Sequence, residues 1–371
     1  MRTAAVALIL AAGAALAADS LLERVKAKVV ENTRRVPRYT CVETINRGEY
    51  RPRFQAERAS CAGLIQARDK LDSPGYQTWR DRLRLDVAVL DGKETFSWAG
   101  ADKFETTDLQ KLVPTGSAGS GDFASFLATI FGKPGVKIAA AGDDLFQFEV
   151  PLNISGYIYR SRANVARVTD YYGTILVDPA TADMKQLTVD ADDFPPDEPV
   201  CRVRDVMDYQ RVKIGDGDFV MPDKAVMSVL FSSGNESQNE TTYSNCREYT
   251  GESTIRFDDD AAQNTANQHA ASHKVPARVK VQLALKDLID SETAAAGDGV
   301  TAVVLRNAKG IKAGEQFPGR MVRIEQFLFP EPRWVVAFQF DGLSLSRPIF
   351  TFDERGALKL DQRFHFDAET R

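Results

Sequence analysis

Alternating apolar and polar residues run through most of the chain and predict a mainly β protein. Residues 82–90 show the pattern most clearly, with four apolar side chains on one face of a strand: Leu83, Leu85, Val87 and Val89. Asp91-Gly92 is a hairpin turn signal, and Phe96 and Trp98 share one face of the next strand. The pattern predicts further strands at 145–150, 154–160, 173–178, 185–190, 201–213, 218–231 and 242–249.

Helical spacing occurs in three shorter segments. Residues 20–33 begin with a capping-box pair, Ser20 and Glu23, and then repeat apolar residues every three or four positions. Residues 60–71 form a second candidate helix. A third follows Asp122 and ends at Gly132; its apolar residues fall at i, i+3, i+4 and i+7, namely Phe123, Phe126, Leu127 and Ile130.

A change of composition divides the chain in two. Residues 259–276 are polar, nearly free of aliphatic side chains and end in Pro276, which is typical of a linker. Strand patterns resume at 278–286, 299–305, 320–328 and 333–341. We therefore expect an open antiparallel half-barrel with inserted helices over 18–258, followed by a small β-barrel or sandwich over 277–371.

The first residues have the features of an export signal. Arg2 precedes an apolar run over 4–17 that ends in Ala15-Leu16-Ala17, a small-residue cleavage pattern. A transmembrane anchor is the weaker interpretation, because the run is shorter than the roughly 18–20 residues of a membrane span. The sequence predicts a mature chain that starts near Ala18, has no transmembrane segment and is periplasmic or secreted.

The four cysteines are expected to form disulfides in that oxidising compartment. Cys41–Cys61 is the favoured pair, because its loop is short and easily closed. Cys201 and Cys246 then remain, but a regular three-strand meander over 201–250 would separate them by roughly 10 Å. Their connectivity is left open.

Charge and motifs exclude several classes of function. The formal net charge of −5 argues against a nucleic-acid partner. The three histidines lie outside the larger predicted domain, two of them at His269 and His273 in the linker, and no nucleophile, phosphate-loop or zinc motif is present. We therefore expect no cofactor, no metal and no catalytic activity. A carboxylate-dependent hydrolase stays open, because the fold rather than the spacing pairs two carboxylates.

Several segments resemble the bacterial periplasmic lipoprotein-carrier superfamily, which includes the outer-membrane lipoprotein carriers and related regulators of envelope-stress signalling. The resemblance covers about residues 20–258 and rests on the early strand 39–44, on Arg82–Asp86 and on the Asp178-Pro179 turn before the strand around Leu187. It implies an incomplete β-barrel with helices in its concavity that binds acyl chains or lipoproteins without catalysis.

The C-terminal part resembles small β-barrel modules of bacterial envelope proteins, in which a turn glycine leads into a strand. Four residues fit that pattern: Ser291, Ala294, Gly297 and Asp298. This resemblance implies a structural turn and no chemistry.

Together these observations predict a non-catalytic binding protein for an apolar or acylated component of the cell envelope. The ligand is expected between the aromatic helix and the apolar strand face, which comprise Leu83, Leu85, Val87, Val89, Phe96, Trp98, Phe123, Phe126, Leu127 and Ile130. The alternative is a structural or protein-interaction component of the envelope with a filled core.

Overall fold

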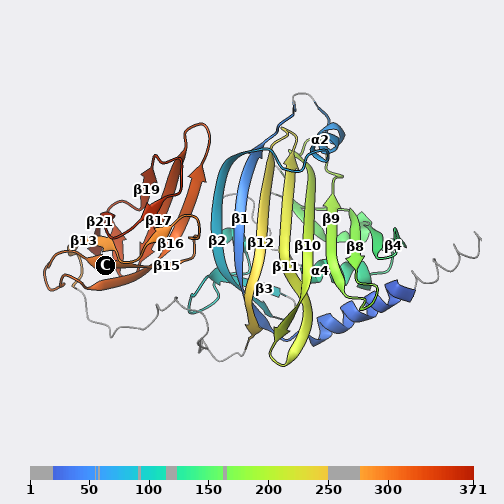
Figure 1. The fold of residues 1–371 in the computed structure, drawn as a ribbon, viewed down its shortest axis with the longest axis horizontal. Coiled ribbons are helices and arrows are strands. Elements are labelled where there is room, and N and C mark those ends of the chain that lie inside the picture. The colour runs from blue at the N-terminus through green and yellow to red at the C-terminus, as the bar shows by residue number, and fades with distance from the viewer. Residues whose placement is uncertain are drawn as a thin grey trace, which may run out of the picture.

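The computed structural model describes residues 20–54, 56, 59–90, 93–113, 123–161, 165–249 and 276–371. The predicted export signal and residues 259–275 of the predicted linker lie outside this part of the chain. The described residues form a mainly β structure with few helices and a large, open antiparallel sheet, as the alternation predicted (Figure 1).

The order of the strands explains why the sheet stays open. Hydrogen bonding places them side by side as β3 (Lys93–Trp98), β2 (Tyr76–Leu90), β1 (Tyr39–Arg51), β12 (Glu236–Glu248), β11 (Gly217–Phe231), β10 (Val200–Ile214), β9 (Met184–Ala191), β8 (Tyr171–Val177), β5 (Leu145–Val150) and β4 (Lys137–Ala140). No pairing joins β3 to β4 among the described residues, so the two ends do not close into a barrel.

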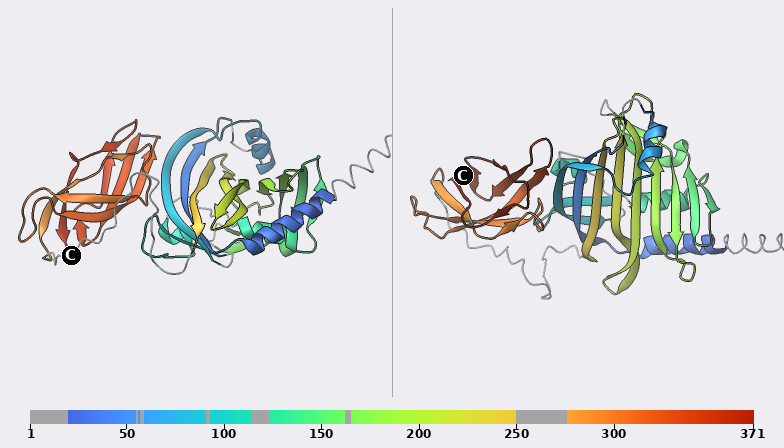
Figure 2. Two further views of the ribbon diagram at one scale, coloured as in Figure 1. Left: turned by 60° about the horizontal axis from the view of Figure 1, so that its bottom comes forward. Right: turned by 45° about the horizontal axis from the view of Figure 1, so that its top comes forward.

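The two faces of this sheet carry different elements. On one face, which we call the helix-covered face, the N-terminal helix (residues 20–35) and α4 (Phe123–Gly132) pack on β5, β8, β9 and β10. The N-terminal helix buries Leu21 and Val25 against the sheet, and α4 buries Ile130 and Phe131. Figure 2 shows the N-terminal helix crossing one end of the strands.

The opposite face carries α2 (Cys61–Arg68), whose N-cap is Ser60. Leu64 of α2 is fully buried against Leu230 and Cys201. The C-cap residue Asp69 accepts two hydrogen bonds from Arg202, at 2.7 and 2.9 Å. A disulfide and an ion pair therefore hold this short helix on the sheet.

All four cysteines are oxidised, as predicted, but the favoured pairing is wrong. The bonds join Cys41 to Cys246 and Cys61 to Cys201. Cys41 and Cys246 lie on the neighbouring strands β1 and β12, with Cα atoms 4.1 Å apart. Beyond Cys41, β1 continues for ten residues, about 33 Å of extended chain, so Cys61 lies past its far end.

One predicted strand is in part helical. Residues 154–160 were expected to be extended, but α5 (Leu152–Ser155) occupies their first part and β6 (Tyr157–Arg160) the rest. Gly156 separates the two elements with φ of 72°, a left-handed conformation that ends a helix at little cost for glycine. β6 pairs with β7 (Ala166–Thr169) in a separate hairpin.

The C-terminal residues form a second set of strands beside β2 (Figures 1 and 2). They are β13 (Lys280–Leu285), β14 (Ile289–Asp290), β15 (Gly299–Val304), β16 (Gln316–Phe327), β17 (Arg333–Phe340), β18 (Leu343–Leu345), β19 (Ile349–Phe352), β20 (Lys359–Leu360) and β21 (His365–Thr370). A cluster of phenylalanines fills their interior, with Phe338 stacked on Phe366.

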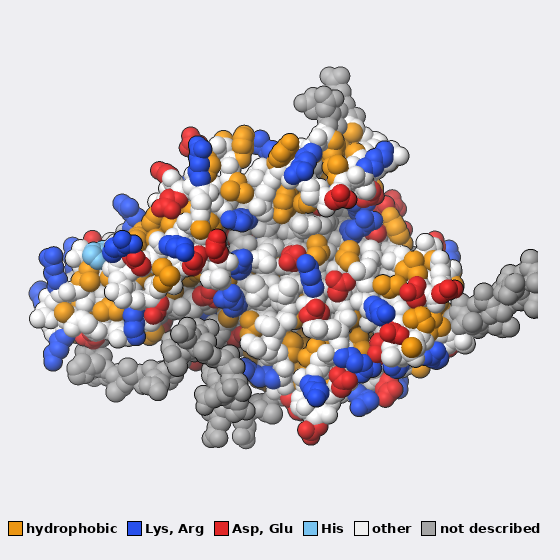
Figure 3. All heavy atoms as spheres, viewed as in Figure 1, with side chains coloured by type: hydrophobic (Ala, Val, Ile, Leu, Met, Phe, Trp, Pro, Cys, Tyr) orange, Lys and Arg blue, Asp and Glu red, His pale blue; other side chains and the backbone are white. Residues whose placement is uncertain are grey.

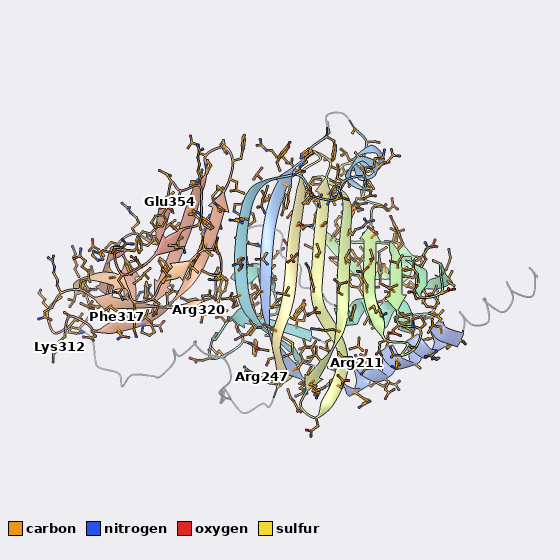
Figure 4. The ribbon with its side chains drawn as sticks, viewed as in Figure 1. Arg211, Arg247, Lys312, Phe317, Arg320 and Glu354 are labelled. Atoms are coloured by element: carbon orange, nitrogen blue, oxygen red, sulfur yellow. A yellow bond between two sulfur atoms is a disulfide. The ribbon has the colours of Figure 1, made fainter. Side chains whose placement is uncertain are left out.

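The two parts share one edge of sheet and one core. β16 pairs with β2 through Glu325 and Asp81, and Ala296 bridges to Leu83 where β3 has ended. Arg320, labelled in Figure 4, donates to the carbonyl oxygen of Ala99 across this seam and to that of Gly297 within the C-terminal part. Buried residues of β1, β2 and β3 belong to the same cluster as those of the C-terminal strands.

A peptide map tests the disulfide connectivity. Proteolysis of unreduced protein should give one cross-linked species that contains Cys41 with Cys246 and one that contains Cys61 with Cys201, detected by mass spectrometry. Reduction should release both, and titration of the denatured, unreduced chain should find no free thiol. A peptide that joins Cys41 to Cys61 would contradict the structure.

The stability of the protein should depend strongly on an ion pair beside the seam. Arg47 and Asp81 have side chains only 2% and 4% exposed, and Arg47 Nε donates to Asp81 Oδ1 at 2.9 Å. D81A leaves a guanidinium group buried without this carboxylate, so we expect a loss of about 3–5 kcal/mol in urea unfolding.

The matched control is the exposed pair Lys137–Glu149, whose side chains are 80% and 66% exposed. E149A should cost less than about 1 kcal/mol, because water screens the pair. Equal losses in D81A and E149A would refute the importance of burial at Arg47.

Candidate functional site

A row of residues that are polar except for Met227 crosses the helix-covered face from strand to strand, and we call it the polar row. The pairing register places Asp205 of β10, Met227 of β11, Asn239 of β12, Arg47 of β1 and Asp81 of β2 side by side. Asn239 and Arg47 are 1% and 3% exposed. Buried polar residues on a sheet face are costly unless they are partnered, so a row of them marks the part of the face where the sequence departs from simple core packing.

The helices leave the middle of this face partly uncovered. On β11, Ala225, Met227 and Val229 point to the helix-covered face and are half-buried, whereas Leu187 and Val189 on β9 are fully buried under the helices. We call these three β11 side chains the apolar track. Solvent reaches the track although its neighbours on β12, Ser237, Asn239 and Thr241, are buried, so the structure has a solvent-accessible apolar surface inside the curved sheet.

Aromatic rings border the track on the side of α4. The rings of Phe126, Tyr157 and Tyr171 form a triangle, with centroids 5.4 to 5.8 Å apart. Tyr157 stands on β6, directly after the turn at Gly156, and Phe126 comes from α4. α4 and the β6–β7 hairpin thus place aromatic rings next to each other.

One carboxylate lies beside these rings. The hydroxyl of Tyr157 donates to Asp205 Oδ2 at 3.4 Å. Burial raises the pKa of Asp205 to about 7, the negative charge of Asp190 raises it further, and the Tyr157 hydrogen bond opposes both. Asp190 itself is held on the opposite face by Arg204, at 2.7 Å. Asp205 has no cationic partner among the described residues.

A separate cavity of about 110 Å³ lies between the N-terminal helix and the ends of β10 and β11. Its lining includes Val29, Leu127, Tyr209 and Val220, and none of the three track residues. Arg211, labelled in Figure 4 beside the N-terminal helix, is at its rim and pairs with Asp183 at 2.8 Å. The charges of Arg211 and Asp183 at the rim therefore neutralise each other.

Glu43 is the second unusual acid on the same face. It is 1% exposed, and its Oε2 atom has no hydrogen-bond partner among the described residues. Burial raises the pKa of Glu43 to about 8, with a further contribution from Glu94, while a hydrogen bond with Tyr243 opposes the shift. Glu43 is sealed from solvent, so it bears on stability rather than on ligand contact.

The predicted ligand-binding residues fall into two separate groups. Leu83, Leu85, Val87 and Phe96 are at most 3% exposed and lie in the core that β2 shares with the C-terminal strands, with Trp98 partly buried against it and Val89 half-buried. Phe126, Leu127 and Ile130 belong to the other cluster, under α4. The side chain of Phe123 lies outside the described residues. By register, Leu83 and Leu85 are on the helix-covered face, but the two groups belong to separate core clusters.

The sequence contained a signal for the residues that were missed. Val203, Asp205 and Met207 alternate on one face of β10, and Ala225, Met227 and Val229 do so on β11. An acid at the central position of an otherwise apolar alternation is the signal for Asp205. The alternation does not reveal which strands lie beside β10 and β11.

No protein-family model, curated protein or solved structure matches the chain. The resemblance to the lipoprotein-carrier superfamily therefore stays a prediction. Within the described part of the chain, no helix is both long and apolar enough to cross a membrane. The described residues also contain no group of three or more histidine, cysteine or acidic side chains placed to hold a metal ion.

Glu43 should make the protein less stable as the pH rises. The folded state holds the Glu43 proton up to about pH 8, whereas an unfolded glutamate releases it near pH 4.5. Between these values the folded state binds more protons, so the free energy of unfolding falls with rising pH, by at most about 1.4 kcal/mol per pH unit.

In E43Q, an uncharged isostere of the protonated acid, this contribution should disappear. Urea unfolding of both proteins from pH 5 to pH 8 measures it: the stability of E43Q relative to wild type should rise across the range. Parallel curves would contradict a raised pKa at Glu43.

Proposed function

We propose that this chain is an exported, non-catalytic binding protein for an apolar or acylated component of the cell envelope, acting as a carrier or sensor. The observation that carries the proposal is the apolar track, because it is an accessible apolar surface on a face that is otherwise covered. The two disulfides support an oxidising compartment outside the cytoplasm.

The track has suitable dimensions for one acyl chain. From Ala225 to Val229, the two ends of the track, β11 advances four residues, or about 13 Å. Burying ten methylenes contributes about 8 kcal/mol before the costs of association, which reduce the result to micromolar affinity or weaker. A carrier or sensor that must release its ligand needs affinity of this order.

The described surface fits a small apolar ligand better than a polymeric anion. The face seen in Figure 3 mixes lysine and arginine with aspartate and glutamate over the whole sheet, with both signs interspersed. Many of the arginines are also engaged in ion pairs, as Arg204 is with Asp190 and Arg211 with Asp183.

Filling the track tests the proposal. M227W places a large ring in the apolar track and should weaken binding of the neutral fluorescent probe N-phenyl-1-naphthylamine at least tenfold. V226W is the matched control, because Val226 is the next residue of β11 and points to the opposite face. It should change the affinity less than twofold.

Thermal unfolding of both variants checks that the fold is intact. Absence of saturable probe binding by the wild-type protein would favour the alternative, a structural component with a filled core. Equal effects of M227W and V226W would place the probe elsewhere.

A further inference from the structure

The surroundings of the apolar track also indicate which polar head group its ligand carries. Resting on the proposed function, we propose that the site selects an amphiphile with a cationic alkylammonium head over one with a carboxylate head, and that Asp205 is the residue that binds the ammonium group.

The charges on the helix-covered face support this choice. Across the middle of β10, β11 and β12 the side chains on this face are Val203, Asp205, Met207, Ala225, Met227, Val229, Ser237, Asn239, Thr241 and Tyr243. They include one carboxylate and neither lysine nor arginine. Arg47, the next residue along the polar row, is bound by Asp81, so its charge is already neutralised.

An anionic head group would therefore meet a like charge and no cation to compensate it. The cost would be greater than in water, because partial burial lowers the effective dielectric constant around Asp205. An ammonium group gains in the same environment, because it provides the positive partner that Asp205 lacks among the described residues. The raised pKa of Asp205 is consistent with a carboxylate that awaits such a partner.

Aromatic rings add a second attraction for a cation. Phe126 and Tyr157 are half-buried, lie 5.7 Å apart and stand on the same side of the sheet as Asp205. Ring faces attract alkylammonium groups, and the attraction grows when water is excluded. The Tyr157 hydroxyl also donates to Asp205 Oδ2, at 3.4 Å. A carboxylate beside two rings is a recognition surface for an organic cation.

The chain position of Asp205 places the head group at a defined point of the track. Asp205 lies directly opposite Met227 in the β10–β11 ladder. The alkyl chain then extends along the apolar side chains of β11 in the direction of Ala225, whose ladder partner on β10 is Met207. The carboxylate thus lies beside the middle of the track.

A competition experiment with amphiphiles of equal length tests the inference. Dodecylammonium and dodecanoate, each below its critical micelle concentration, and neutral dodecanol, below its solubility limit, are titrated against the full chain loaded with N-phenyl-1-naphthylamine at pH 8. At this pH Asp205 is mostly ionised. Dodecylammonium should displace the probe at a concentration at least tenfold lower than dodecanoate, with dodecanol in between.

Two asparagine variants separate recognition from general charge. D205N should reduce the preference for dodecylammonium to less than threefold while probe binding itself persists. D208N is the control: Asp208 is on the same strand, points to the opposite face and accepts from Gln186 at 2.8 Å. It should keep the tenfold preference.

The outcomes distinguish the two proposals. An unchanged preference in D205N, or equal displacement by dodecanoate and dodecylammonium, overturns the cation inference while the binding function stands. If the wild-type protein binds neither probe nor amphiphile, the binding function fails, and the head-group inference fails with it.

Discussion

The ion pair between Arg47 and Asp81 is the constraint on which the rest of the structure depends. It lies on the helix-covered face at the level where β2 has lost β3 as its neighbour and pairs with β16 instead. Trp79 extends the same contact, because Arg47 lies over its ring and its indole nitrogen donates to Glu325 of β16 at 3.4 Å. Neither charge is tolerable there alone, so the pair fixes the position of β1, β2 and the C-terminal strands together.

The same pair also defines where the interior becomes available to a ligand. Between Arg47 and the helices, the polar row contains Asn239, Met227 and Asp205, and solvent reaches only the last two of these three residues. The buried charges to one side are fully engaged, whereas the carboxylate on the other side is not paired with a cation in the described structure. The sheet continues across this face without a gap. One half of the face carries paired, buried charges, and the other half carries an accessible carboxylate without a cationic partner in the described structure.

Local patterns in the sequence were sufficient to predict most elements. The alternation at Leu83, Leu85 and Val87 gave a strand with one buried face, and the spacing of Phe126, Leu127 and Ile130 gave α4. What covers each face depends on contacts between distant residues, which alternation does not encode. The strand face was expected against the Phe123–Ile130 helix, but it belongs to one core cluster with residues of the C-terminal strands, because Ala296 and β16 complete the edge of β2. The predicted disulfide pairing was wrong for the same reason.

The separation of the bonded cysteines has a consequence for how the chain acquires its bonds. Each bond spans more than a hundred residues, 205 for one and 140 for the other. In an exported chain that emerges from its N-terminus, Cys41 and Cys61 meet an oxidant long before Cys201 and Cys246. Oxidation in order of emergence joins the wrong two, so the native bonds require either delayed oxidation or thiol–disulfide exchange after the last strand has entered the sheet. For this fold, the timing of oxidation or the capacity for exchange decides whether the native bonds form.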